Sequence, residues 1–441
     1  MEEYPKYLQL FRSLDIYLLM AFRDEKLNSS IDEYLKAFIK GEATVAEEHL
    51  EIASVIARTM IKKSGERVGI DTVEYYSKVS FEMAKKLFKA RRTTEEISKI
   101  AAIDNFQECI NKLEKAKLIF IEHEAIRDVQ TNVSLLAKFL SRAGRIEDAN
   151  QEIEIWLKSA EEKGYLFNKA QLIYQQAQIA VYQGSEQLGV QKALESLDIC
   201  NRVGVESFTL YPLFLISQIQ AEFGQSQLAF TKSLEGLSTS LKYNNLAFAS
   251  QFFQCSGLAS FGLNLPELAE AYVKESVRVS KQGNLFVYLA VARTVLAVLL
   301  AEKGNFVEAK NLIEKARLED TAKVSDPATR RQQIFRISGY EGKVYGLAKD
   351  FSKAEQCYKQ SLQLAEELGY EKILGLYQTV QGLGESLLEQ GKNEEALKVL
   401  LKARDMYTKA QLNLQVKGNN RLLDVNFSTR KIDEAIKLVQ R

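Results

Sequence analysis

The sequence predicts an all-α solenoid, in which antiparallel helical hairpins follow one another along the chain. Three observations predict this fold: helix-forming residues dominate, only 4 of the 441 residues are proline, and residues that end helices recur at a fixed spacing. The 23 glycines are few for a protein with many strands and tight turns. A chain of this length can therefore be one solenoid that grows by repetition.

The repeat is clearest between residues 125 and 317, where its step is 40 residues. The small residues that open the second helix of each hairpin are Ala149, Gly189, Ala229, Ala269 and Ala309. Chain-reversing residues stand five positions before these, at Gly144, Gly184, Gly224, Asn264 and Gly304, and fifteen positions after the first four, at Gly164, Gly204, Asn244 and Asn284. Gly and Asn tolerate the left-handed conformation that ends many helices. Each period therefore has two predicted helix stops.

The N-terminal part of the chain follows this period only loosely. The pattern predicts, in order, an amphipathic capping helix at 5–24, a hairpin at 30–64, one long helix at 71–90, and a helical pair from Thr93 or Thr94 to about His123. We therefore expect an N-terminal helical region with irregular hairpins at residues 1–122. A regular array of about eight hairpins is expected at residues 123–441.

Beyond Ala309 the step loosens, and the corresponding small residues are Ala354, Ala396 and Ala435. The first of these longer intervals contains a polar insert, Leu318–Thr329, which predicts a surface loop. The prolines are expected at element boundaries, with Pro212 and Pro266 opening helices and Pro327 in the loop. The chain ends on apolar Ile436, Leu438 and Val439 where a solenoid usually has a polar cap. This end is compatible with truncation or with docking on another surface, including self-association.

Large and small residues alternate in a recurring pattern within each hairpin. The first helix carries a large, a small and a large residue, as in Leu136, Ala137 and Leu140 or Leu296, Ala297 and Leu300. In the second helix the small opening residue is followed by an apolar and a small one, as in Ala309, Ile313 and Ala316 or Ala396, Leu400 and Ala403. The pattern resembles the tetratricopeptide repeat (TPR) superfamily, in a long-helix form of about 40 residues per unit. Gly or Asn replaces the proline that usually ends a TPR unit.

The resemblance implies a right-handed superhelical solenoid whose first helices line a concave groove. Transferring the family's register places these partner-binding candidates in the groove: Gln171, Tyr174, Gln178, Tyr182, Tyr211, Phe214, Gln218, Gln251 and Gln254. Aromatic rings offer rigid contact area, and glutamine amides can bond the backbone of an extended peptide. The competing interpretation is that some of these side chains are core between repeats. The Lys/Asn pattern of TPR proteins that bind the carboxylate end of chaperone tails is absent. The equivalent positions hold Ser134 and Lys138, Tyr174 and Gln178, Phe214 and Gln218, and Thr294 and Val298.

The sequence offers little for catalysis or for a cofactor. It has two histidines, His49 and His123, which are too few and too far apart for a metal site or a histidine-based triad. The four cysteines, Cys109, Cys200, Cys255 and Cys357, form no CxxC motif and are expected to be reduced thiols. We therefore expect no enzyme activity, no catalytic residues, no metal and no cofactor.

Charge and hydropathy argue against nucleic-acid and membrane partners. The 59 basic and 58 acidic residues leave a net charge of +1, which provides no long-range field for an anionic partner. No signal peptide is visible. The most apolar run, residues 285–301, contains Arg293 and is expected to be a repeat helix with no membrane insertion. A cytoplasmic location is expected, or a nuclear one in a eukaryote.

Two functions remain open at this point. The first is a protein–protein interaction scaffold, or a subunit of a multiprotein complex, that binds a partner segment in the groove. The second is a regulator gated by a peptide or other small ligand, with residues 1–122 as its effector. The size of the ligand separates them, because a scaffold needs a folded protein or a long segment and a receptor needs only a few residues. The sequence does not identify the partner.

Overall fold

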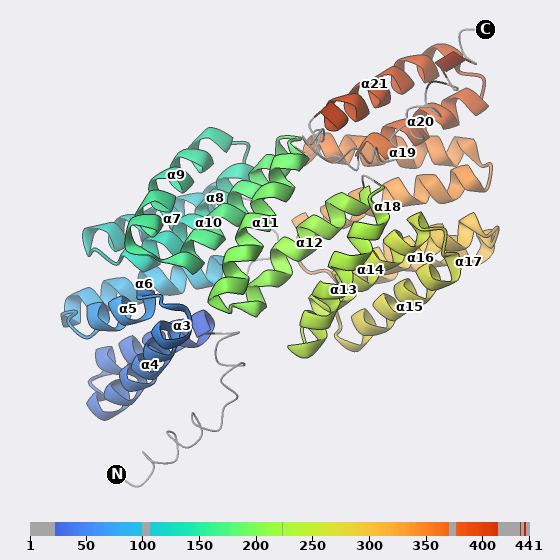
Figure 1. Cartoon of the computed structure of the whole chain (residues 1–441). Coiled ribbons are helices and arrows are strands. Elements are labelled where there is room, and N and C mark those ends of the chain that lie inside the picture. Colours follow the sequence, from blue (N-terminus) through green and yellow to red (C-terminus); the bar gives the residue numbers. More distant parts are fainter. Residues whose placement is uncertain are drawn as a thin grey trace. The chain divides into compact units, whose positions relative to one another are not determined.

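The computed structural model describes residues 23–98, 106–222, 224–369, 376–412, 433, 436 and 437. In these ranges every regular element is a helix, so the predicted all-α class is confirmed (Figure 1). The helices are α3 (Arg23–Lys40), α4 (Ala43–Ser64), α5 (Val68–Tyr76), α6 (Phe81–Ser98), α7 (Phe106–Glu122), α8 (Ile126–Arg142), α9 (Ile146–Lys163), α10 (Leu166–Tyr182), α11 (Glu186–Val203), α12 (Glu206–Glu222), α13 (Ser226–Lys242), α14 (Leu246–Gly262), α15 (Pro266–Gln282), α16 (Phe286–Glu302), α17 (Phe306–Glu314), η1 (Lys315–Asp320), η2 (Thr321–Lys323), α18 (Pro327–Leu347), α19 (Phe351–Glu367), α20 (Leu376–Glu389) and α21 (Asn393–Leu412).

The helix boundaries confirm the 40-residue repeat. The first helices of five successive hairpins begin at Ile126, Leu166, Glu206, Leu246 and Phe286, and the second helices begin at Ile146, Glu186, Ser226, Pro266 and Phe306. All nine predicted helix-stop residues have positive φ angles, between 52° and 81°. The two stops of each period are therefore left-handed turns, as expected from residues that adopt this conformation at low cost.

The asparagine stops provide a direct test of this account. Asn284 has a φ of 52° between α15 and α16. A side chain with a full Cβ and no local hydrogen bond costs about 1–2 kcal/mol in the left-handed region, so Asn284→Ala is expected to lower the free energy of unfolding by about 1 kcal/mol. Asn284→Gly should preserve or raise it. Chemical denaturation of the variants provides the measurement.

The matched control for this test is Asn311, an exposed residue inside α17. Asn311→Ala replaces a poor helix former by the best one and is expected to be neutral or slightly stabilising. Equal effects of Asn284→Ala and Asn311→Ala would contradict the left-handed requirement at position 284.

Two predictions in the N-terminal part are wrong. The single helix expected at 71–90 is interrupted, because α5 ends at Tyr76 and α6 begins at Phe81. The Ser80 hydroxyl accepts a hydrogen bond from the Met83 amide at 3.3 Å and so caps a new helix. Thr93 and Thr94 lie inside α6 and do not open a helix. Their hydroxyls bond carbonyls one turn earlier, on Lys89 and Ala90.

Pro212 does not open a helix as predicted, since it lies inside α12. Pro266 does stand at the start of α15, as expected. Pro327 opens α18 and is not in a loop. The Asp326 carboxylate caps that helix by accepting a hydrogen bond from the Thr329 amide at 2.6 Å.

The loop predicted at Leu318–Thr329 is largely helical. The π-helix η1 ends at Asp320 and the 3₁₀ turn η2 follows it directly. Asp320 is 1% exposed and accepts a hydrogen bond from the Arg293 guanidinium of α16 at 2.8 Å. This buried ion pair holds the insert against the repeat, which local sequence preferences could not indicate.

The described C-terminal residues extend the repeat pattern. Ala354 and Ala396 are fully buried, as expected of the small residues that open second helices. Ile436 is 5% exposed and packs against Val380, Leu400 and Ala403. Ala435, Leu438 and Val439 of the predicted open end lie outside the described residues. The same holds for the capping helix expected at 5–24, except for its last two residues.

The fold divides into two compact units. Unit 1 comprises Met1–Ile100, Asn105–Gln176 and Lys192–Pro212, and unit 2 comprises Ala101–Asp104, Ala177–Gln191 and Leu213–Arg441. The three divisions in the middle of the chain fall within helices, one each in α10, α11 and α12. The boundary expected at residue 123, between irregular and regular hairpins, was based on repeat spacing and not on compact units. It stays a prediction.

The core of unit 2 is aliphatic and is centred on α16. Leu296 and Leu300 of this helix are 6% exposed and pack in one cluster with Ile313, Ile337 and Val344 from the helices that follow. The most apolar run of the sequence is therefore the centre of a repeat core, as predicted. None of the described helices combines the length and the apolar character that crossing a bilayer requires.

Unit 1 contains a buried group of charged side chains, here called the ionic network: Arg23, Asp24, Glu66, Arg91, Arg127 and Asp128. Arg23 bonds the Asp24 carboxylate at 3.1 Å and also pairs with Glu66. Glu66 in turn accepts a hydrogen bond from the Phe167 amide at 2.8 Å. Burial raises the pKa of Glu66, and the neighbouring Arg23 opposes that rise. Helices α3 and α10 are thus connected through the turn that precedes α5.

Candidate functional site

The nine candidate residues lie on the first helices of three successive hairpins, α10, α12 and α14, and differ in exposure. Tyr211 is 44% exposed. Tyr174 and Gln254 are buried, at 6% and 8%. The other six are partly exposed: Gln171, Gln178, Tyr182, Phe214, Gln218 and Gln251. Seven of the nine side chains therefore reach solvent, and two serve packing.

In unit 1, the exposed Tyr211 belongs to an aromatic cluster with Phe167, Tyr174 and Phe208. The ring of Tyr211 lies 5.1 Å from Phe208 and 5.9 Å from Tyr174 between centroids, and Tyr174 meets Phe208 edge-on at 5.8 Å. Such edge contacts fix the rings in place and add about 0.5–1.5 kcal/mol per pair. The cluster therefore presents one face of Tyr211 to solvent on a rigid support.

In unit 2, Phe214 of α12 contacts two rings of the next first helix. Its centroid lies 6.4 Å from that of Phe248 and 6.1 Å from that of Phe252, and these two rings stack at 6.0 Å. Phe252 is fully buried, whereas Phe214 is partly exposed. Phe214 therefore joins the core with one edge and reaches solvent with the other.

Gln254 has a structural role. Its amide donates to the Ser276 hydroxyl at 3.1 Å and to the Ser250 hydroxyl at 3.4 Å. These two hydroxyls are 2.9 Å apart and both are fully buried. The amide thus satisfies a buried polar group between α14 and α15. It is the kind of core position that the competing interpretation of the sequence allowed.

Sequence reasoning missed Phe208 and Phe248, which support the exposed aromatic side chains. A signal for them was present, because aromatic residues recur with the 40-residue step at Phe208, Phe248 and Tyr288. Phe208 precedes Tyr211 by three positions, and Phe248 precedes Gln251 by three. The two residues of each pair therefore lie on one face of a first helix.

The described residues contain no group of three or more His, Cys, Asp or Glu side chains arranged to hold a metal ion. The four cysteines form no disulfide, and Cys109, Cys200 and Cys255 are buried. Burial raises the pKa of Cys200 to about 12, so this thiol is not activated as a nucleophile. The seven candidate side chains that reach solvent are aromatic or amide-bearing and carry no charge, which suits contact with an uncharged part of a polypeptide.

Comparison with solved structures finds proteins of similar fold. A crystal structure of a Rap protein complexed with competence and sporulation factor superposes with a TM-score of 0.54 at 14% sequence identity, covering 88% of this chain and 99% of that one. The fold is that of a TPR-like helical repeat protein. The likeness is one of fold, and it agrees with the repeat fold that the large–small pattern indicated.

Other helical repeat proteins superpose less closely. NprR in complex with its cognate peptide NprX gives a TM-score of 0.44 at 16% identity, covering 81% of this chain and 89% of that one. Yeast Tom70 gives 0.36 at 14% identity, covering 95% and 97%. No protein-family model and no curated protein sequence matches the chain.

Proposed function

We propose that this TPR-like protein is a non-catalytic binding protein that holds a segment of a partner protein, or a short peptide, against the first helices of its hairpins. The observation behind the proposal is Tyr211, which is 44% exposed although its ring packs against those of Tyr174 and Phe208. An exposed ring that is already ordered loses little entropy on contact with a ligand. Tyrosine is also among the residues that dominate binding interfaces.

Amide side chains on the first helices of each unit suit an extended polypeptide ligand. Partly exposed glutamines occur on the same helices, at Gln171 in unit 1 and at Gln218 and Gln251 in unit 2. An amide group can donate to a peptide carbonyl and accept from a peptide N–H at once. An alternation of aromatic contact and amide hydrogen bonding therefore suits the backbone of a ligand whatever its sequence.

A peptide-gated regulator is the second candidate within this proposal. It is favoured by the fold likeness to the Rap protein, which was solved with competence and sporulation factor and whose match extends over 88% of this chain. A scaffold should need a folded partner or a long segment. A receptor should be saturated by a peptide of a few residues.

The proposal is tested by affinity purification from the source cells, followed by native mass spectrometry of the eluted complex. Tyr211→Ala removes an exposed ring from unit 1, and Gln218→Ala, tested separately, removes a partly exposed amide from unit 2. The buried Tyr174 and Gln254 are left in place. Truncating a hot-spot tyrosine typically costs 2 kcal/mol or more, so Tyr211→Ala is expected to weaken binding by at least about tenfold. The matched control is Leu228→Ala on α13, a second helix, where Leu228 is 54% exposed.

Two outcomes decide the proposal. Loss of a stoichiometric ligand from Tyr211→Ala, with binding retained by Leu228→Ala, supports it. Equal binding by both variants places the ligand elsewhere and contradicts it. The mass of the retained ligand then separates a protein partner from a peptide of a few residues.

A further inference from the structure

One apolar contact in unit 2 joins repeats that are distant in the chain. Ile219 of α12 and Tyr377 of α20 pack against each other and are 4% and 5% exposed. The hairpins α14–α15, α16–α17 and α18–α19 lie between them in sequence. Repeats of a solenoid normally contact only their neighbours. This contact is therefore not a consequence of stacking and needs a separate explanation.

Other buried apolar residues of α20 pack within the C-terminal repeats. Val380, one turn after Tyr377, packs in one cluster with Leu400 of α21. Leu383 packs in another with Tyr358 of α19. Helix α20 thus has ordinary stacking contacts with the helices before and after it, and Tyr377 adds a contact to α12. Tyr377 and Val380 therefore form a matched pair, one with a distant contact and one with a local contact.

Aliphatic side chains surround the contact on the α12 side. Val181 of α10, Val190 of α11 and Leu215 of α12 pack against the pair of Ile219 and Tyr377. Leu215 lies one turn before Ile219, so these two residues form a continuous apolar strip on α12. Three successive helices, all within unit 2 at these positions, therefore take part in the contact.

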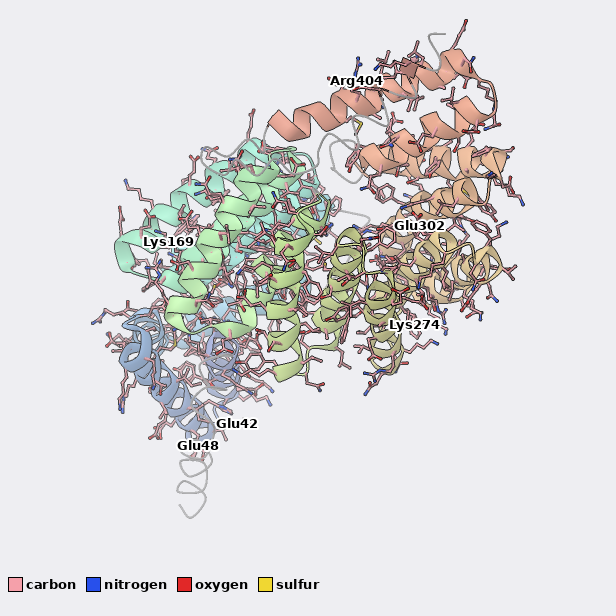
Figure 2. The ribbon with its side chains drawn as sticks, turned by 45° about the vertical axis from the view of Figure 1, so that its right-hand side comes forward. Glu42, Glu48, Lys169, Lys274, Glu302 and Arg404 are labelled. Carbon is pink, nitrogen blue, oxygen red and sulfur yellow. The ribbon has the colours of Figure 1, made fainter. Side chains whose placement is uncertain are left out.

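The C-terminal hairpin supplies the other side of the contact. Met406 of α21 packs against the same pair. The Arg404 side chain of this helix, labelled in Figure 2, is 45% exposed and pairs with Asp433 at 3.5 Å. Helix α21 therefore turns Arg404 to solvent and Met406 toward the contact. The Gln378 amide donates to the Tyr377 hydroxyl at 3.3 Å, which gives the polar end of the ring a partner within α20.

The contact lies on a stretch of α12 that carries two of the candidate residues. Phe214 directly precedes Leu215, Gln218 directly precedes Ile219, and both candidates are partly exposed. Leu215 and Gln218 are three positions apart and so lie on one face of the helix. The C-terminal hairpin thus occupies apolar surface beside side chains that are proposed to hold a ligand.

We propose that the hairpin α20–α21 is an autoinhibitory clasp, which occupies this face of α12 until a ligand displaces it. The proposal rests on the proposed function and adds a regulation of the same surface. The contact is small, with one ring at its centre, so it can open while the helices on both sides stay folded. The free energy spent on opening is lost from ligand binding, so the clasped chain binds a ligand more weakly than the open chain.

The clasp is tested first by hydrogen exchange of the full chain without a ligand. Tyr377→Ala is expected to quicken amide exchange at least about tenfold in α12 as well as in α20, because it removes a buried ring that joins them. Val380→Ala is the matched control, since Val380 is 1% exposed on the same helix but packs within its own hairpin. This control should quicken exchange in α20 and α21 and leave α12 unchanged.

A second variant removes the contact from the opposite side. Ile219→Ala leaves Tyr377 and Met406 in place and is expected to quicken exchange in α20 although the substitution is in α12. Circular dichroism confirms that each variant is folded. Faster exchange confined, in both variants, to the repeat that carries the substitution would overturn the clasp.

Control of the binding surface is tested with peptides. The immobilised full chain is incubated with a sub-saturating equimolar mixture of random pentapeptides with blocked termini, and retained peptides are quantified by mass spectrometry. Tyr377→Ala is expected to retain about tenfold more peptide than the wild type, because the apparent affinity scales with the fraction of chains whose surface is open. Val380→Ala should retain about as much as the wild type.

The two measurements separate the clasp from the proposed function. Faster exchange in α12 with unchanged peptide retention by Tyr377→Ala would show that the contact does not cover the binding surface, and would overturn the proposal. Equal gains by Tyr377→Ala and Val380→Ala would also overturn it, because general loosening of the hairpin would then be the cause. Failure of every form to retain peptide would contradict the proposed function and the autoinhibition with it, and the exchange result would still show whether α12 and α20 are joined.

Discussion

Arg91→Met is expected to lower the free energy of unfolding of unit 1 by about 3–5 kcal/mol, because it leaves buried carboxylates without their partner. Arg91 is 7% exposed, and its Nε donates to Asp32 at 2.6 Å while its Nη1 pairs with Asp128. Asp128 is itself 7% exposed and accepts a hydrogen bond from the Tyr76 hydroxyl at 2.7 Å. Burial and the charge of Asp128 raise the pKa of Tyr76, so the phenol stays a donor.

The measurement is urea denaturation followed by circular dichroism, with hydrogen exchange to locate the loss in α3, α6 and α8. Arg92→Met is the matched control, since the adjacent Arg92 side chain is 49% exposed and its pair with Glu95 should contribute about 0–1 kcal/mol. The double variant Arg91→Met, Asp128→Asn removes the orphaned charge and is expected to recover part of the loss. Equal effects of the Arg91 and Arg92 substitutions would show that the ionic network does not hold unit 1 together.

The repeat could be predicted from sequence because it depends on local backbone conformation. A residue such as Gly144 or Asn284 ends a helix through its own φ preference, and nothing distant has to be known. The buried small residues are equally local, since Ala309 and Ala396 admit a neighbouring helix simply by lacking bulk. Because these signals recur every 40 residues, chance does not account for them.

The ionic network could not be predicted, because its partners are distant in sequence. Arg91 lies 37 residues from Asp128 and 59 residues from Asp32. In the sequence it stood within a run of basic residues that is typical of a solvated helix face. A distant contact also accompanies the interruption between α5 and α6, since the Tyr76 hydroxyl at the end of α5 donates to Asp128, 52 residues away.

The candidate site was predictable in part. Exposed side chains such as Tyr211 were among the positions that the family register selected, because the exposed face of a helix follows from its periodicity. The register could not distinguish the buried Tyr174 and Gln254 from the exposed candidates, because burial depends on how closely the neighbouring helices approach. The 40-residue recurrence of aromatic residues at positions 208, 248 and 288 was the overlooked clue to the rings that support the surface.

Gly236→Ala is expected to lower the free energy of unfolding of unit 2 by about 1–2 kcal/mol, although alanine is normally the better helix residue. A Cβ atom at position 236 would lie 2.1 Å from the Cζ atom of Phe252, a fully buried ring that also contacts Phe214. Displacing such a ring costs about 1–3 kcal/mol, or more, and the gain in helix propensity returns at most about 1 kcal/mol. Chemical denaturation provides the measurement.

The same substitution elsewhere supplies the control. Gly346 lies inside α18 with open space around its would-be Cβ, so Gly346→Ala is expected to raise the free energy of unfolding by about 0.5–1 kcal/mol. The opposite signs of the two changes would show that contact with Phe252, and not backbone preference, requires glycine at position 236. Phe252→Leu should relieve the clash, so the double variant with Gly236→Ala is expected to lose less than the two single variants together. Additive losses would contradict this account.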